Sequence, residues 1–361
     1  MKIERREFLK YLPISAFTLP NILSAENSLD VKKQIQQKNT IKPKRLRAGS
    51  RIGIVAPASP ITPSDFESIS KKLQDLDLVA IPSKNLFKRF GYLAGIDNER
   101  INDLHEMFLR KDIDGILCAR GGYGTPRILK YLDYELIKRN PKIIIGYSDI
   151  TSLLISVYQK TGLVTFHGPV GISNFNDFSK KYFKKILFEG ADYVEFISEP
   201  EINSNSNEYN YNSIEGILKI FPGRSEGILI GGNLSLLISL IGTEFDFDLN
   251  EKILFLEEVG EEPYRIDRML TQLINSNKFK NCRGVVLGRF SNCEVKKENP
   301  SFSKSLTLRE VLIDRLGQLG IPVIYGLSFG HIKNKFSLPI GVRAMIDVDR
   351  EKFVLIENAV T

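Results

Sequence analysis

The repeated order of an apolar strand followed by a helix, between residues 51 and 158, constrains the fold of this chain most. Short apolar runs typical of strands lie at 51–55, 77–81, 115–119 and 143–146. Helical patterns follow them at 63–76, 97–110, from 125 onward, and at 150–158. The strand runs are apolar on both faces, which is typical of parallel strands covered by helices on both sides. The sequence therefore predicts a parallel α/β sheet with its functional residues at the carboxyl ends of the strands.

One serine stands at such a strand end. Ser148 follows Gly146 by two residues and comes just before the helical pattern at 150–158. A serine on a tight strand-to-helix turn exposes its hydroxyl near the amides that begin the helix, as in a nucleophile elbow. The run here is Gly-Tyr-Ser-Asp rather than the Gly-x-Ser-x-Gly of α/β hydrolases, so a simple helix N-cap is the alternative role for Ser148.

A glycine-rich turn follows the neighbouring strand. The run Arg120-Gly121-Gly122-Tyr123-Gly124 comes directly after the 115–119 strand, so it lies at the same sheet edge as Ser148. It lacks the Lys-Ser/Thr pair of a P-loop, which argues against nucleotide binding.

A polar break separates a second half with its own strands. The stretch 199–213 is rich in Asn, Ser and Glu and is typical of a linker. Further strands are predicted at 216–220, 227–233, 252–256, 284–288 and 323–326, with helices at 234–240 and 266–274. No internal repeat is evident, so two different domains are expected.

A nucleophilic serine needs a base, a carboxylate that orients the base, and amides that receive the oxyanion. Histidine is scarce: His105, His167 and His331 are the three in the chain. Glu257 comes directly after the 252–256 strand, and His331 follows the 323–326 strand and a loop. The order Ser, Glu, His would let the second domain supply the last two groups. A loop histidine that caps a carbonyl is the alternative for His331.

Taken together, these motifs resemble the LD-carboxypeptidase family, serine peptidases that trim peptidoglycan peptides. The resemblance runs from about Leu46 to the C-terminus. Eight segments carry it in the right order: Val55-Ala56-Pro57-Ala58-Ser59, Ala119-Arg120-Gly121-Gly122-Tyr123-Gly124, Ile145-Gly146-Tyr147-Ser148-Asp149, Phe166-His167-Gly168-Pro169, Gly231-Gly232-Asn233-Leu234, Leu256-Glu257-Glu258-Val259, Tyr264-Arg265-Ile266-Asp267-Arg268 and Gly330-His331.

The resemblance implies a flavodoxin-like first domain with a parallel sheet, a smaller β-rich α/β second domain, a homodimer, no cofactor and no metal. It implies Ser148 as nucleophile, Glu257 as carboxylate and His331 as general base. It also implies an oxyanion hole made by the amides of the Gly121-Gly122 turn, Gly122 in particular, and of Asp149. Many members carry Glu-Asp where this chain has Glu257-Glu258. Either glutamate could therefore be the carboxylate that orients the histidine, and we favour Glu257.

Two further residues are candidates for substrate binding. Tyr123 either lines the pocket or simply packs. Arg268 either clamps a substrate carboxylate with its two parallel donors or pairs with a neighbouring acid. Structural or ordinary surface roles are expected for His105, His167, Glu261, Glu262 and the Asp149 side chain, which would cap its own helix.

The first residues predict export. Paired arginines precede Phe-Leu-Lys, a short apolar stretch follows, and small residues end it near residue 25. This order resembles a twin-arginine signal peptide, which would place the mature chain in the periplasm. The apolar stretch is too short and too interrupted by proline for stable membrane insertion. A disordered cytoplasmic leader is the alternative.

Charge and cysteine content exclude several classes of protein. The net charge of +7 is spread along the chain. The lysine-rich stretch 179–185 is more typical of a solvated helix face than of a nucleic-acid-binding site. The three cysteines lack C-x-x-C spacing, so neither a disulfide framework nor a zinc site is expected. In an oxidising compartment, a disulfide between Cys282 and Cys293 remains an open alternative.

The predicted organisation is therefore a signal peptide (1–25), a flexible spacer (26–44), a nucleophile-bearing domain (45–172), a linker (173–213) and a C-terminal domain (214–361). The function expected is hydrolysis of the bond to the terminal D-alanine of murein tetrapeptides, without a metal, through an acyl-enzyme. Two alternatives stay open: a microcin-immunity type peptidase, and a catalytically silent periplasmic binding protein for wall peptides.

Overall fold

The computed structural model describes residues 40–199, 216–296 and 298–361, which belong to one structural unit, Asn39–Thr361. The predicted signal peptide, most of the spacer and part of the linker lie outside the described residues. Residues 40–44 of the predicted spacer are described. Ile41 bridges to Leu163, and Lys42 pairs with Glu357 at 2.6 Å, so this end of the spacer is attached to the fold.

The first sheet contains six strands in the order β12-β5-β4-β3-β1-β2. Five of them are parallel: β1 (Arg51–Val55), β2 (Val79–Pro82), β3 (Gly115–Cys118), β4 (Ile143–Gly146) and β5 (Thr165–His167). The sixth, β12 (Leu338–Ile340), comes from the far end of the chain and pairs antiparallel with β5. The C-terminal part of the chain therefore completes the first sheet, which the predicted boundary at 214 did not anticipate.

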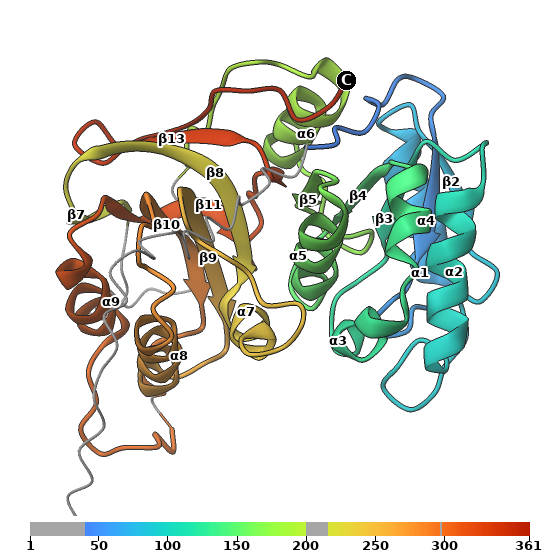
Figure 1. The fold of residues 1–361 in the computed structure, drawn as a ribbon. Helices are drawn as coiled ribbons and strands as arrows, with labels where there is room; N and C mark the ends of the chain where they lie inside the picture. Colours follow the sequence, from blue (N-terminus) through green and yellow to red (C-terminus); the bar gives the residue numbers. More distant parts are fainter. Residues whose placement is uncertain (1–39, 200–215, 297) are drawn as a thin grey trace, which may run out of the picture. The chain divides into compact units, whose positions relative to one another are not determined.

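Helices follow the strands of this sheet, as the alternating pattern predicts (Figure 1). They are α1 (Pro63–Gln74), α2 (Asp97–Leu109), α3 (Thr125–Ile128), η1 (Leu129–Tyr131), α4 (Tyr134–Arg139) and α5 (Ile150–Thr161). Some of their ends follow ordinary capping rules. Thr62 and Asp65 form a capping box at α1, and Gly162 ends α5 with a φ of 80°.

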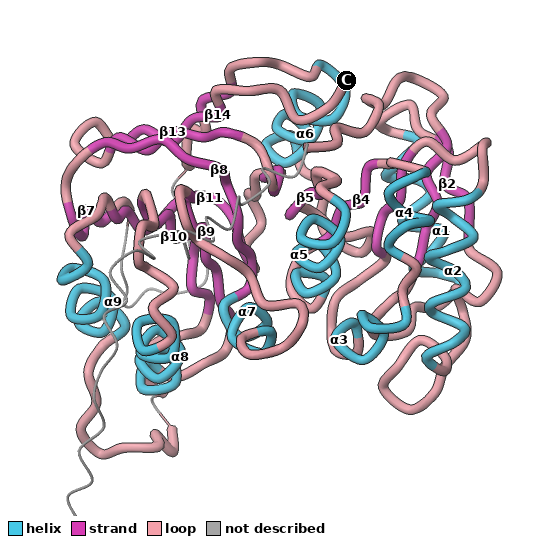
Figure 2. The backbone as a smooth tube through the Cα atoms, in the orientation of Figure 1, coloured by secondary structure: helices cyan, strands magenta, loops and turns pink. Residues whose placement is uncertain are grey.

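The second sheet contains eight strands in the order β6-β14-β13-β8-β9-β10-β11-β7, so it is the larger of the two. Its central strands are parallel: β8 (Arg224–Asn233), β9 (Lys252–Val259), β10 (Gly284–Ser291) and β11 (Val323–Gly330). Antiparallel strands complete both edges: β6 (Val194–Glu195), β7 (Leu218–Phe221), β13 (Arg343–Asp347) and β14 (Lys352–Leu355). Figure 2 shows these strands apart from those of the first sheet.

The remaining helices are α6 (Asp177–Lys184), the π-helical turn η2 (Lys185–Glu189), α7 (Leu234–Leu240), α8 (Pro263–Asn275), α9 (Leu308–Leu316) and η3 (Gly317–Leu319). The segment 173–199, predicted as linker, is thus largely structured. Its helix α6 buries Tyr182 and Phe183. The surrounding lysines had led to the prediction of a solvated helix face, so the burial of these two aromatic rings was not expected. No helix among the described residues is long and apolar enough to cross a membrane.

Two strand ends differ from the prediction in a way that matters for the site. Strand β9 continues to Val259, so Glu257 and Glu258 lie within it rather than after it. Strand β11 continues to Gly330, so His331 follows the strand directly, without a loop. Both strands run on because they pair with β10 beyond a register shift at Leu287. Glu257 and His331 are therefore held by the sheet itself.

Candidate active site

Ser148 occupies a strained turn between β4 and α5. Its φ of 64° lies in the left-handed region, which non-glycine residues adopt rarely. The N-cap of α5 is Asp149, so the alternative role of Ser148 as the N-cap is wrong. Observed strain of this kind clusters at functional sites, and it is the geometry that a nucleophile elbow requires.

The glycine-rich turn lies against this serine. A Cβ added to Gly121 would stand 3.2 Å from the Ser148 Oγ. Gly122 has a φ of 115°, and a Cβ there would stand 2.1 Å from the Ser59 Oγ, so only glycine fits. The Ser59 Oγ also accepts a hydrogen bond from the Tyr123 amide at 3.4 Å. The close approach brings backbone amides of the turn into the neighbourhood of the nucleophile.

The Asp149 side chain leaves its own helix and reaches the start of α3. Its carboxylate accepts hydrogen bonds from the Thr125 amide at 2.8 Å and from the Thr125 hydroxyl at 2.7 Å. It makes no capping hydrogen bond to α5, so the expectation that it caps its own helix is wrong. Burial raises the pKa of this carboxyl, and the hydrogen bonds from Thr125 and Gly124 oppose that rise.

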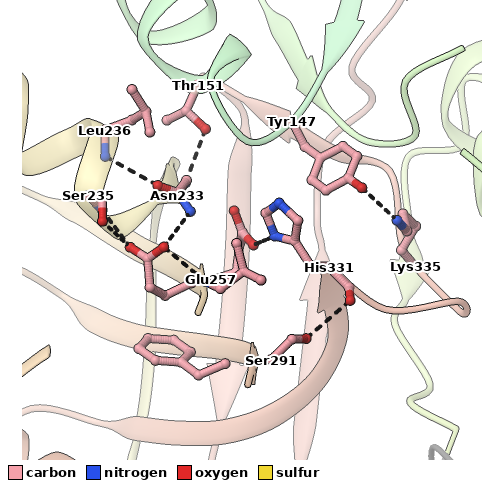
Figure 3. Close-up of polar contacts among 12 residues, drawn as sticks. Tyr147, Thr151, Asn233, Ser235, Leu236, Glu257, Ser291, His331 and Lys335 are labelled. Atoms are coloured by element: carbon pink, nitrogen blue, oxygen red, sulfur yellow. Dashed lines mark hydrogen bonds and ion pairs between the residues drawn. The ribbon is translucent and has the colours of Figure 1, made fainter. Parts of the chain in front are cut away.

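Glu257 and His331 form a hydrogen-bonded pair. The His331 Nδ1 lies 2.7 Å from the Glu257 Oε2. Figure 3 draws this contact as a dashed line. The Glu257 side chain is completely buried, whereas 20% of the His331 side chain is exposed. Burial alone would raise the pKa of Glu257, but the hydrogen bond and the charge of His331 outweigh it and lower that pKa. With Nδ1 held by a carboxylate, Nε2 is the nitrogen left to accept a proton.

Glu258 faces away from this pair. Its carboxylate accepts hydrogen bonds from the Asn233 Nδ2 at 3.0 Å and from the Ser235 amide at 2.7 Å. Neighbouring residues of a strand point to opposite faces, so only one of the two glutamates can meet His331. Burial raises the pKa of Glu258. Of the two competing carboxylates, Glu257 is the one in contact with the imidazole.

Tyr147 links the serine turn to the histidine. Its ring lies 4.9 Å from the His331 ring and 6.0 Å from the His167 ring, centroid to centroid. The buried Lys335 places its ammonium 4.3 Å from the centre of the Tyr147 ring and donates to the Tyr147 hydroxyl at 3.3 Å. Because Tyr147 precedes Ser148 in the chain, this packing brings the nucleophile turn of the first sheet beside His331 of the second.

A second contact joins the same two sheets. The Asn233 amide at the end of β8 donates to the Thr151 Oγ1 of α5 at 3.0 Å. A Cβ on Gly232 would stand 2.4 Å from the Thr151 side chain, which explains the glycine before Asn233. The sequence assigned no role to either contact residue, although the Gly-Gly-Asn run at the end of a predicted strand was the available signal.

His167 is almost fully buried beside the pair. Its ring packs against Phe255 at 5.2 Å and Phe329 at 6.4 Å. Burial lowers its pKa to about 4, so it is a neutral imidazole at neutral pH. These surroundings agree with the structural role expected for it.

The two predicted substrate residues are both exposed. Tyr123 packs edge-on against Tyr92, with ring centroids 5.6 Å apart and 51% of the residue exposed. Arg268 lies on α8 with its guanidinium 5.3 Å from the centre of the Tyr264 ring. No contact among the described residues joins Arg268 to Ser148, Glu257 or His331.

Several minor expectations need correction. Glu262, expected to be solvated, is 6% exposed and accepts hydrogen bonds from the Ser301 amide and hydroxyl. His105, expected to be an ordinary surface residue, accepts a hydrogen bond from the Asp133 amide through Nε2 at 2.9 Å. Cys118, Cys282 and Cys293 are all buried and free, so Cys282 and Cys293 do not pair.

Arg100 was missed entirely. It is 2% exposed, and its Nη1 donates to the Pro57 carbonyl at 2.6 Å and to the Gly124 carbonyl at 2.9 Å. It therefore ties α2 to the glycine-rich turn. The sequence feature that could have pointed to it is its position next to Ile101 on the buried face of the predicted 97–110 helix. A charged side chain on a buried face needs a hydrogen-bond or ion-pair partner.

The arrangement has the parts of an acyl-transfer site: a partly exposed serine on a strained elbow, an imidazole oriented by a buried carboxylate, and backbone amides nearby. Within residues 40–199, 216–296 and 298–361, no group of three or more His, Cys, Asp or Glu side chains could hold a metal ion.

Comparison with known proteins agrees with this geometry. The LD-carboxypeptidase N-terminal domain matches residues 52–168, and the LD-carboxypeptidase C-terminal domain matches residues 226–346. The chain is 40% identical over 326 residues to a probable murein peptide carboxypeptidase of Bacillus subtilis, covering 89% of this chain and 95% of that one. It is 30% identical to the murein tetrapeptide carboxypeptidase of Pseudomonas aeruginosa, covering 83% and 94%.

Solved structures show the same fold. The microcin C7 self-immunity protein MccF in its apo state matches with a TM-score of 0.77 and 29% identity, over 89% of this chain and 100% of that one. Muramoyltetrapeptide carboxypeptidase from Oxalobacter formigenes matches with a TM-score of 0.73 and 28% identity, over 86% and 100%. These matches confirm the predicted fold class and the resemblance seen in the sequence motifs. The chain belongs to the LD-carboxypeptidase family.

Proposed function

We propose that this protein is a serine carboxypeptidase that hydrolyses the L,D bond to the terminal D-alanine of murein tetrapeptides, leaving a tripeptide. The observation that carries the proposal is the hydrogen bond between the buried Glu257 and the partly exposed His331, beside the strained Ser148 turn. The likeness to proteins named as murein peptide carboxypeptidases supports the choice of substrate.

In the first step, the His331 Nε2 accepts the Ser148 proton while the Ser148 Oγ attacks the scissile carbonyl carbon. Glu257 holds Nδ1 and stabilises the imidazolium that forms. The carbonyl oxygen becomes an oxyanion, which the amides of Gly122 and Asp149 receive. These groups stabilise charge that is absent from the bound substrate and develops in the transition state, so they raise kcat rather than substrate affinity.

In the second step, the intermediate collapses and the bond to the D-alanine nitrogen breaks. His331 gives its proton to that nitrogen, so D-alanine leaves as a neutral amine and the tripeptide remains as an ester of Ser148. A water molecule then loses a proton to His331 and attacks the ester. Release of the tripeptide returns the proton to the Ser148 oxygen and completes the cycle.

We also propose Tyr123 and Arg268 as substrate contacts. Tyr123 stands on the glycine-rich turn with half of its surface exposed, next to the nucleophile turn that Gly121 touches. The Arg268 guanidinium is exposed on α8 and has the fork geometry that carboxylates bind well. Replacement of each by alanine should raise KM for the tetrapeptide more than it lowers kcat.

The direct experiment is mass spectrometry of a defined murein tetrapeptide incubated with the mature chain. The wild-type chain should release D-alanine and tripeptide, and Ser148→Ala should release neither while keeping the wild-type circular dichroism spectrum. Peptides with lysine and with diaminopimelate at the third position should both be tried, because the proposal concerns the bond and not that side chain. Full activity of a folded Ser148→Ala variant would remove Ser148 from the mechanism.

The likeness to MccF favours a second candidate, a microcin-immunity type peptidase. One MccF structure is described as a complex with aspartyl sulfamoyl adenosine. Comparing cleavage of that compound with cleavage of a murein tetrapeptide separates the two activities. We expect the tetrapeptide to have the higher kcat/KM, because the relative with 40% identity is named for murein peptides.

We further propose that the chain is exported to the periplasm by its twin-arginine leader and acts there as a homodimer. Residues 1–25 support the first proposal, and the family resemblance supports the second. Cell fractionation should find the protein in the periplasm, and replacing Arg5 and Arg6 by lysine should retain it in the cytoplasm. Light scattering of the mature chain should give twice the mass of one chain.

A further inference from the structure

Two buried charged side chains hold the end of the glycine-rich turn, at Gly124 and the next residue, Thr125. The Arg100 guanidinium donates to the Gly124 carbonyl at 2.9 Å. The Asp149 carboxylate accepts hydrogen bonds from the Thr125 amide at 2.8 Å and from the Thr125 hydroxyl at 2.7 Å. Gly124 has a φ of 133°, and a Cβ there would stand 2.8 Å from an Arg100 nitrogen, so the turn and its clamp are fitted closely to each other.

The clamp joins the two parts of the proposed oxyanion hole. Asp149 directly follows the nucleophile Ser148, and Gly124 stands two residues after Gly122. The side chain of Asp149 therefore connects the serine turn to the turn that carries the second amide. On the other side, Arg100 anchors Gly124 to the Pro57 carbonyl at the end of β1.

Stability alone is a weak reason for this arrangement. Asp149 is 1% exposed and Arg100 is 2% exposed, and burying charges costs several kcal/mol per ion even when they are paired. The mechanism above uses neither side chain in a proton transfer. A buried network of charged hydrogen bonds favours one geometry, which is what a transition-state site needs.

We propose that the Asp149 carboxylate and the Arg100 guanidinium are positioning residues that set the distance between the oxyanion-binding amides and Ser148. This inference rests on the proposed function. An oxyanion is absent from the bound substrate and forms on the way to the tetrahedral intermediate, so loosening the clamp should lower kcat and leave KM nearly unchanged. Loss of a single oxyanion donor lowers kcat by roughly 100- to 1,000-fold in serine peptidases, so mispositioning should cost about 10- to 100-fold.

The experiment compares Asp149→Asn and Arg100→Lys with the wild-type chain. Each variant keeps the size or the charge of the residue but loses part of its hydrogen bonding. Asp133→Asn is the matched control, because Asp133 also accepts an amide hydrogen bond at a helix start, from Leu136 at the N-terminus of α4, away from the turn. If Asp149→Asn or Arg100→Lys does not fold, Thr125→Val is measured in its place. This variant removes the hydroxyl that donates to Asp149.

Four quantities are measured for each variant: kcat and KM with the tetrapeptide, the affinity for the tripeptide product, and the fraction of active sites by fluorophosphonate titration. The inference predicts a kcat per active site about 10- to 100-fold lower in the clamp variants, with KM and product affinity within about threefold of wild type. Asp133→Asn should keep the wild-type kcat.

Two outcomes would overturn the inference. A purely structural role would lower the fraction of active sites and leave kcat per active site unchanged. A substrate-binding role would raise KM and weaken product affinity in proportion to the loss of kcat/KM. Failure of the proposed function is a different result, because the wild-type chain would then release no D-alanine.

Discussion

The Nδ1 atom of His331 lies 2.7 Å from the Oε2 atom of Glu257, although the two residues are 74 positions apart in the chain. Each is placed by a long strand of the second sheet, β9 for Glu257 and β11 for His331. The carboxylate is completely buried and the imidazole is partly exposed. One side of the histidine is thus fixed by the protein, and its ring packs beside Tyr147, the residue that precedes Ser148.

This pairing predicts different effects for two neighbouring substitutions. Glu257→Gln should lower kcat by about 100- to 10,000-fold, because the amide no longer fixes the tautomer or stabilises the imidazolium. Glu258→Gln should change kcat less than tenfold, but should destabilise the fold by about 1–3 kcal/mol by disturbing the hydrogen bonds to Asn233 and Ser235. Steady-state kinetics and urea unfolding measure both effects. The reverse order of kcat losses would assign Glu258 to the catalytic pair.

The contact between Gly121 and Ser148 predicts a substitution that damages activity but not stability. In Gly121→Ala the new methyl group would stand 3.0 Å from the Ser148 Cβ and 3.2 Å from its Oγ, so the serine must shift. We expect kcat to fall at least about tenfold, since small displacements of reacting groups are costly. Gly317→Ala is the control, because its methyl group would meet only the Ile220 side chain at 3.9 Å. Equal kcat in the two variants would contradict the close approach.

His167 predicts how stability changes with pH. Burial lowers its pKa from 6.5 to about 4, so the folded chain binds this proton less readily than the unfolded chain does. The stabilisation is therefore complete above pH 6.5 and is lost as the pH falls from 6.5 to 4. Since one pKa unit corresponds to about 1.4 kcal/mol, the loss is about 3 kcal/mol.

The variant His167→Gln isolates this contribution, because glutamine does not titrate. Chemical unfolding at several pH values should show a smaller loss of unfolding free energy between pH 6.5 and 4 in the variant than in the wild-type chain. Identical pH curves for the two proteins would show that His167 titrates normally in the folded state.

The cysteines predict the behaviour of the protein toward thiol reagents. All three are free and buried, and burial raises the pKa of Cys282 to about 11 and of Cys293 to about 12. A thiolate is the reactive form, so the native chain should react slowly with a chromogenic disulfide, and three thiols should react after denaturation. The melting temperature should not change on reduction. A count of one thiol in the denatured, unreduced protein would reveal a disulfide.

The strand-and-helix order of the first half could be predicted from the sequence because each element carries its own signal. The helix at 97–110 and the strand at 143–146 lie where the apolar pattern places them, within a residue or so. Ser148 could be found for the same reason, since the strand, the glycine and the helix are adjacent in the chain. The Glu257–His331 contact required the family resemblance, because no local pattern tells which distant strand ends meet.

Other features depend on tertiary context that no local pattern records. Strand β12 is three residues long and pairs with β5, 171 positions earlier at its nearest register (Leu338 with His167), so its assignment needs the completed sheet. The Asp149 side chain could have capped either of two helices, and the sequence favours the nearer one. The buried Arg100 became intelligible only when the Gly124 carbonyl was seen beside it.

The most direct test of the central claim, that His331 and Glu257 activate Ser148, is the site and rate of covalent modification by a fluorophosphonate. Peptide mapping by mass spectrometry should find one adduct, on Ser148, in the wild-type chain. His331→Ala should react at least about 100-fold more slowly, and Ser148→Ala should not react. An adduct on another residue, or an unchanged rate in folded His331→Ala, would contradict the account.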